Sequence, residues 1–187
     1  MTPINGLLLA GGESRRMGQP KALMLLDGIP QYQRSASLLK PFCRQIFISC
    51  RSEQAPLFPD FPLILDKMEY AGHGPLSGLL SYFEVHTTPV LMLGCDYPLL
   101  QATTLEQLFE ARNPAATATV FEMPDGWILP MPAIFEASAK ALLLRHFEAG
   151  NDSVRRALEQ AALQRVEPLA PEQLRSFDTP GDWEIFN

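Results

Sequence analysis

Short runs of apolar residues recur along the first half of the chain, and each is followed by a turn and then by apolar residues at helical spacing. The runs lie at residues 4–9, 45–49, 63–65 and 90–93. They are apolar without alternation, which is typical of strands buried on both faces of a parallel sheet. Helices are expected between them at residues 32–39, 75–83 and 103–110. This alternation predicts a three-layer α/β/α sandwich with a mostly parallel central sheet.

The second half of the chain is less regular. A strand is expected at residues 117–121, whereas Pro130 and Pro132 favour an edge strand or an extended loop over 127–135. Helices are expected at residues 138–148 and 154–160, with a final helical turn at 182–186. With no repeat or linker in 187 residues, residues 1–187 are expected to form a single domain.

The charge of the chain argues against a nucleic-acid partner. The formal net charge is −6, and the cations do not form a stripe that could follow a phosphate backbone. The densest basic cluster is Arg15, Arg16 and Lys21. A local basic pocket in an acidic protein favours a small anion over a polymer.

The cysteines and the hydropathy pattern favour a cytoplasmic protein. Cys43, Cys50 and Cys95 are odd in number and lack the spacing of metal ligands, which is typical of reduced thiols. The opening apolar run has its arginines after it, which is the wrong order for a secretory signal, and no run is long enough to span a membrane.

The segment 7–23, LLLAGGESRRMGQPKAL, leaves the first expected strand and carries most of the basic cluster. Gly11 and Gly12 would let the backbone take positive φ and let a ligand approach closely, and successive N–H groups can form an anion-binding concavity. Lys21 is followed by Ala22, so the P-loop pattern fails. A flexible surface loop is the alternative, but its place at the carboxyl end of a parallel strand favours a ligand site.

Two aspartates follow other expected strands in the same way. Asp96 comes directly after the strand in LMLGCDYP, where a carboxylate could bind Mg²⁺ together with substrate phosphates, or could cap the next turn. Asp66 ends LIL and could face a nucleotide or help place the metal, or could only open a turn. His73, in the glycine-rich stretch that follows, is more typical of a solvated loop. A phosphate cradle facing a metal carboxylate suits phosphoryl-type transfer.

These motifs resemble those of the MobA-like nucleotidyltransferases, and within them the branch of the molybdenum cofactor guanylyltransferases. The stretches concerned are LAGGESRRMGQPKA, GIP, GPLSG and GCDYP, in that order along the chain. The resemblance implies a Rossmann-like nucleotidyltransferase fold that uses GTP and Mg²⁺. The phosphate of molybdopterin, carrying molybdenum, would attack the α-phosphate of GTP and release pyrophosphate.

The resemblance also implies roles for particular residues. The nucleotide contacts would come from Leu9, Ala10, Gly11, Gly12, Lys21, Asp66 and Asp96. The catalytic residues would be Arg16 and Lys21, which neutralise the triphosphate, and Asp96, which binds Mg²⁺. The family typically has an asparagine where this chain has Ser49 or Cys50, and paired asparagines where it has Ser176 and Asp178.

Two alternatives stay open at this point. One is cytidylyl or other nucleotidyl transfer to a different phosphorylated acceptor, since the glycine loop and the aspartates do not choose the base. The other is a catalytically silent nucleotide-binding accessory of molybdoenzymes. Other proteins of molybdenum cofactor biosynthesis, or molybdoenzyme chaperones, are conceivable partners.

Overall fold

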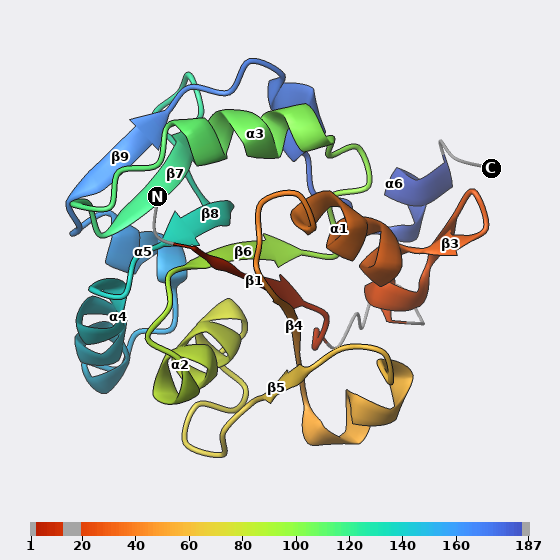
Figure 1. The fold of residues 1–187 in the computed structure, drawn as a ribbon, viewed down its shortest axis with the longest axis horizontal. Helices are drawn as coiled ribbons and strands as arrows, with labels where there is room; N and C mark the ends of the chain where they lie inside the picture. Colours follow the sequence, from red (N-terminus) through yellow and green to blue (C-terminus); the bar gives the residue numbers. More distant parts are fainter. Residues whose placement is uncertain (1–2, 13–19, 185–187) are drawn as a thin grey trace.

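A sheet of seven strands forms the centre of the molecule, in the order β5-β4-β1-β6-β8-β7-β9 (Figure 1). The computed structural model describes residues 3–12 and 20–184. The seven strands are β1 (Asn5–Leu9), β4 (Ile46–Cys50), β5 (Leu63–Leu65), β6 (Val90–Gly94), β7 (Ala118–Glu122), β8 (Ile128–Phe135) and β9 (Leu163–Val166). Strands β5, β4, β1 and β6 pair in parallel, so their carboxyl ends meet at one edge of the sheet.

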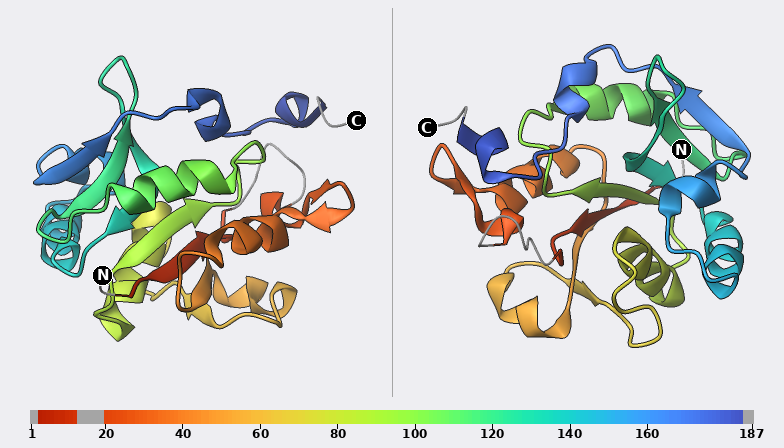
Figure 2. Two further views of the ribbon diagram at one scale, coloured as in Figure 1. Left: turned by 45° about the horizontal axis from the view of Figure 1, so that its top comes forward. Right: turned by 180° about the vertical axis from the view of Figure 1, so that it is seen from behind.

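Helices cover both faces of this sheet. They are α1 (Gln31–Leu39), α2 (Pro75–Val85), α3 (Ala102–Glu110), α4 (Ala139–Glu148), α5 (Val154–Leu158) and α6 (Pro180–Trp183). Figures 1 and 2 show α1 and α3 on one face and α2, α4 and α5 on the other. The expected three-layer sandwich with a mostly parallel sheet is confirmed.

Two apolar cores lie between these layers, because successive strand residues point to opposite faces. In β1, Leu8 packs in the core beneath α1 and α3, and Leu7 packs in the core beneath α2, α4 and α5. Both side chains are fully buried. The unbroken apolar run of this strand thus reflects its place in the middle of the sheet, between β4 and β6.

Several short elements complete the chain. They are the 3-10 turns η1 (Lys21–Leu23), η2 (Ser52–Leu57) and η3 (Pro171–Leu174), and the hairpin of β2 (Leu25–Leu26) with β3 (Ile29–Pro30). After β9 the chain returns along the α3 side of the molecule to α6, which lies near β3 and α1 (Figure 2). This return brings the C-terminal segment to the same end of the molecule as η1.

The expectation of an edge strand at residues 127–135 is wrong, because β8 lies inside the sheet between β6 and β7. It runs antiparallel to both neighbours and pairs with both through 133–135, and with β7 also at Ile128. Pro130 and Pro132 lie between these two paired parts of β8, where the register with β7 shifts between Val120 and Glu122. The prolines therefore fall where the strand has no need to donate regular ladder hydrogen bonds.

Candidate active site

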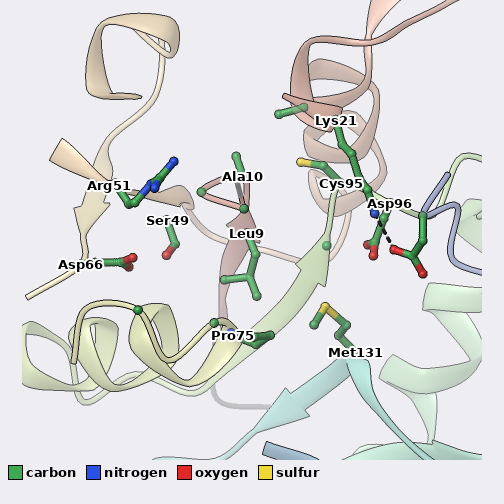
Figure 3. A pocket seen from close by; sticks show the side chains of 17 residues that line it. Leu9, Ala10, Lys21, Ser49, Arg51, Asp66, Pro75, Cys95, Asp96 and Met131 are labelled. Atoms are coloured by element: carbon green, nitrogen blue, oxygen red, sulfur yellow. Dashed lines mark hydrogen bonds and ion pairs between the residues drawn. The ribbon is translucent and has the colours of Figure 1, made fainter. Parts of the chain in front are cut away.

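A pocket of about 600 Å³ lies at the carboxyl edge of the parallel strands (Figure 3). Its lining includes the ends of β1, β4 and β6, the residue that follows β5, the start of α2, and one residue of the C-terminal segment. The lining residues used below are Leu9, Ala10, Gly11, Gly12, Lys21, Ser49, Arg51, Asp66, Asp96 and Asp178. The resemblance predicted contacts from all of these except Ser49, Arg51 and Asp178. Ser49 and Asp178 were considered only as positions where this chain departs from the family pattern. Arg15 and Arg16 lie outside the described residues.

The two glycines after β1 differ from the expectation in their backbone. Neither Gly11 nor Gly12 has positive φ. A Cβ on Gly11 would lie 3.0 Å from Cys50 Cα and 3.4 Å from Arg51 N, so this glycine permits the close approach of the chain after β1 to the end of β4. A Cβ on Gly12, which also lines the pocket, would meet no atom of the described residues within 4 Å.

Lys21 and Asp178 form an ion pair at one end of the pocket. The Lys21 Nζ donates to Asp178 Oδ1 at 2.5 Å, although the two residues are far apart in sequence. The Lys21 side chain is only 18% exposed. The hydrogen bond from Lys21 is the main cause that lowers the pKa of Asp178, which is therefore a carboxylate at neutral pH.

Asp96 lies beside this pair, two residues beyond the end of β6 (Figure 3). Its Oδ1 is buried and has no hydrogen-bond partner among the residues that the structure describes. Burial raises the pKa of Asp96, while the positive charge of Lys21 opposes that shift. An unpaired buried acceptor is costly unless another group satisfies it, so this oxygen fits the role of a metal ligand.

Gly94 makes room for that carboxylate. A Cβ at this position would lie 2.3 Å from Asp96 Oδ1, so any side chain there would displace the oxygen. The backbone carbonyl of Asp96 also accepts a hydrogen bond from the Phe177 N–H at 2.8 Å, one residue before Asp178. The end of β6 therefore fixes both Asp96 and the C-terminal segment.

The other end of the pocket contains Ser49, Arg51 and Asp66 (Figure 3). Burial raises the pKa of Asp66, while the charge of Arg51 and a hydrogen bond with Ser49 oppose the shift. Of the two residues considered at the expected asparagine position, Ser49 lines the pocket, whereas Cys50 is fully buried in the core. The Leu9–Ala10 segment lies between the two ends (Figure 3).

His73 stands apart from these groups. The pocket lining contains its neighbours Gly72 and Gly74, and the His73 ring packs edge-on against Phe147 with centroids 4.9 Å apart. Gly74, with φ of 58°, precedes Pro75, the first residue of α2. The loop therefore contributes its glycines to the pocket lining, while the half-buried His73 ring packs on α4.

Gly78 on α2 supports the Ser49 side of the pocket, and we expect Gly78→Ala to be destabilising. A Cβ there would lie 2.3 Å from Ser49 Oγ and 3.0 Å from Leu9 Cδ2. Overpacking of this kind costs about 1–3 kcal/mol. Urea unfolding checks the value, with Gly181→Ala in α6 as a control, because the nearest atom that a Cβ there meets among the described residues is Thr179 Oγ1 at 3.9 Å. Equal stability of the two variants would contradict the expectation.

Comparison with known proteins decides the family. The family model described as the MobA-like NTP transferase domain matches residues 6–166. This chain belongs to the MobA-like NTP transferase family. It is accordingly a nucleotidyltransferase related to the enzymes of molybdenum cofactor biosynthesis.

Relatives of known name agree with this family. The molybdenum cofactor guanylyltransferase of Pseudomonas putida is 27% identical over 183 residues, which cover 96% of this chain and 95% of the relative. The molybdenum cofactor biosynthesis bifunctional protein of a Synechocystis species is 30% identical over 190 residues. That match covers 100% of this chain but 54% of the Synechocystis protein, so the chain spans about half the length of that relative.

A solved structure shows the same fold. The molybdopterin-guanine dinucleotide biosynthesis protein A of Archaeoglobus fulgidus superposes with a TM-score of 0.81 at 22% identity, covering 97% of this chain and 96% of that one. The two chains therefore share one fold over almost their whole length.

No helix of the described residues is both long enough and apolar enough to cross a membrane. Those residues likewise hold no group of three or more His, Cys, Asp or Glu side chains that could bind a metal ion. A metal at Asp96 would therefore take most of its ligands from substrate phosphates or water, which is common for Mg²⁺.

Proposed function

We propose that this chain transfers GMP from GTP to the terminal phosphate of molybdopterin, the molybdenum-carrying form included. An oxygen of the acceptor phosphate would form a bond to the α-phosphorus of GTP, and the bond from that phosphorus to the bridging oxygen would break and release pyrophosphate. The observation that carries the proposal is the meeting of Lys21 and Asp96 in one pocket at the carboxyl edge of the sheet. The guanylyltransferase named among the relatives supports the choice of substrates.

The residues of the pocket suit this transfer. The backbone of Leu9, Ala10, Gly11 and Gly12 would contact the nucleotide, and the Lys21 ammonium would stabilise negative charge that grows on the phosphates in the transition state. Arg16 would add a second cation, and Asp66 would contact the nucleoside at the other end. Residues 1–187 would form one such domain, acting in the cytoplasm without nucleic acid or membrane.

Asp96 would hold Mg²⁺, since its buried Oδ1 offers an acceptor that no described residue satisfies. When bound, Mg²⁺ supplies charge neutralisation and orientation of the phosphates. Asp178 would otherwise bring a carboxylate close to anionic substrates, but its ion pair with Lys21 compensates that charge. A triphosphate that binds Lys21 would have to compete with Asp178 for this ammonium.

Thermal shifts test the choice of nucleotide. With Mg²⁺ and each of the four nucleoside triphosphates at one concentration, GTP should raise the melting temperature most, because a ligand that binds only the native state stabilises it more the more tightly it binds. Equal shifts, or the largest shift with CTP, would overturn the guanylyl choice and favour the cytidylyl alternative.

An assay of pyrophosphate release tests the reaction. Wild-type protein with GTP, Mg²⁺ and molybdopterin should release pyrophosphate and form the dinucleotide. Complete lack of release, with GTP still bound, would favour the accessory that binds nucleotide for a molybdoenzyme or for another protein of cofactor synthesis.

A further inference from the structure

Arg51 lines the pocket but belongs neither to the glycine loop nor to the aspartates at the strand ends, and the proposed function gives it no role. It follows β4 directly and lies on the same side of the Leu9–Ala10 segment as Ser49 and Asp66, away from Lys21 and Asp96 (Figure 3). A cation that served only the triphosphate would be expected near Lys21. The position of Arg51 at the Asp66 end therefore points to the nucleoside part of the nucleotide.

Local contacts fix the position of Arg51. Its backbone N–H donates to Gln54 Oε1 at 3.2 Å, and its Nε donates to the same oxygen at 3.4 Å. The Nε also lies 3.1 Å from Glu53 Oε1. Gln54 is itself buried, so the first turn of η2 holds the arginine from the side of Nε. Such support lowers the entropy that the side chain would lose on binding a ligand.

The two charged groups at this end offer complementary hydrogen-bonding patterns. An ionised carboxylate presents two acceptors, and a guanidinium presents parallel donors in a planar fork. Asp66 and Arg51 are close enough for the arginine charge to oppose the rise in the pKa of the aspartate. This end of the pocket therefore presents a pair of acceptors beside a fork of donors.

Among the common bases, guanine alone has an adjacent pair of each kind. Its N1–H and N2–H₂ are neighbouring donors, and its O6 and N7 are neighbouring acceptors. Adenine and uracil alternate donors and acceptors along their edges. Cytosine has neighbouring acceptors at N3 and O2 but no neighbouring pair of donor atoms, so none of the three offers both pairs. Arginine bidentate to O6 and N7 is the commonest specific contact with guanine in protein–DNA complexes.

We infer that Arg51 is a base-specificity residue that donates to O6 and N7 of guanine, next to the N1–H and N2–H₂ edge facing Asp66. The inference rests on the proposed function for the identity of the nucleotide. It assigns the choice of base to a residue of this chain outside the glycine loop and outside the Lys21–Asp96 group.

Binding of GTP analogues tests the inference without the acceptor. 7-Deaza-GTP lacks N7, and ITP lacks the N2 amine; isothermal titration calorimetry with Mg²⁺ compares each with GTP. Wild type should bind GTP about tenfold or more tightly than 7-deaza-GTP. Arg51→Ala should bring that ratio close to one and leave the GTP-to-ITP ratio as in wild type.

Two further variants keep the test decisive. Arg44→Ala removes the same charge at an exposed position before the start of β4, and should leave both ratios unchanged. Arg51→Lys keeps the charge but loses the planar fork, so the ratio for 7-deaza-GTP should fall as well, even if Arg51→Ala fails to fold.

The outcomes separate this inference from the proposed function. If wild type prefers GTP to ATP but Arg51→Ala and Arg51→Lys keep the full preference for GTP over 7-deaza-GTP, the role of Arg51 is overturned and GTP remains the substrate. If wild type shows no preference for GTP over ATP, the guanylyl proposal falls as well. If the protein binds GTP with the expected dependence on Arg51 but transfers nothing to molybdopterin, the choice of acceptor is overturned and the inference about Arg51 is supported.

Discussion

Asp96→Asn is expected to abolish pyrophosphate release and to leave the protein folded. The substitution keeps the size of the side chain but removes a carboxylate that fits a Mg²⁺ ligand. Loss of metal-ion stabilisation is worth several kcal/mol, and ~4 kcal/mol corresponds to roughly a thousandfold in rate. A coupled assay of pyrophosphate under saturating GTP and Mg²⁺ measures the effect.

The stability of Asp96→Asn distinguishes loss of function from loss of fold. Burial disfavours the charged form of Asp96 in the native state, so removing the charge should leave the melting temperature equal to or above that of wild type. An inactive variant that melts well below wild type would indicate a structural role. A variant with wild-type activity would remove Asp96 from the metal site.

Lys21→Ala is expected to lower kcat by about a hundredfold to a thousandfold, the range seen when one group that stabilises charge in a transition state is lost. Lys21 lines the pocket and forms an ion pair with Asp178 at one end of it. Steady-state kinetics against GTP separates kcat from KM, so that an effect on the transition state can be told from an effect on binding alone.

Two variants accompany Lys21→Ala. Lys40→Ala removes the same charge from an exposed residue at the end of α1 and should leave kinetics unchanged. Lys21→Ala also leaves the Asp178 carboxylate without its ammonium partner, so adding Asp178→Asn should recover part of the loss in GTP affinity. A Lys21→Ala variant with wild-type kcat would contradict the role of this lysine in catalysis.

The sequence predicted the parallel half of the fold well, because β1, β4, β5 and β6 are mainly apolar and do not alternate with polar residues. It failed for β8, where Pro130 and Pro132 indicated an edge strand, because the irregular pairing that accommodates them depends on β7. It also missed β9, whose pairing with β7 joins segments that are distant in sequence. Local pattern carries no signal for either arrangement.

In the candidate site, Asp66 and Asp96 could be predicted from the sequence, because ligands of parallel sheets bind at the carboxyl ends of the strands. The same rule, taken one residue further along β4, would have found Arg51. The Lys21–Asp178 pair had no such signal, since it depends on the return of the chain after β9. The sequence also could not predict why position 11 needs a glycine, because the close neighbour of Gly11, Cys50, belongs to another strand.

The hydrogen bond from Phe177 to the Asp96 carbonyl has a consequence for the order in which the site forms during synthesis. The strands that carry Ser49, Asp66 and Asp96 are complete long before Asp178 leaves the ribosome. A nascent chain can thus build the Asp66 end of the pocket while the Lys21 end still lacks its carboxylate partner. The segment that carries Asp178 lies beyond the stretch 6–166 that the family model matches, and it is the last part of the pocket lining to be synthesised.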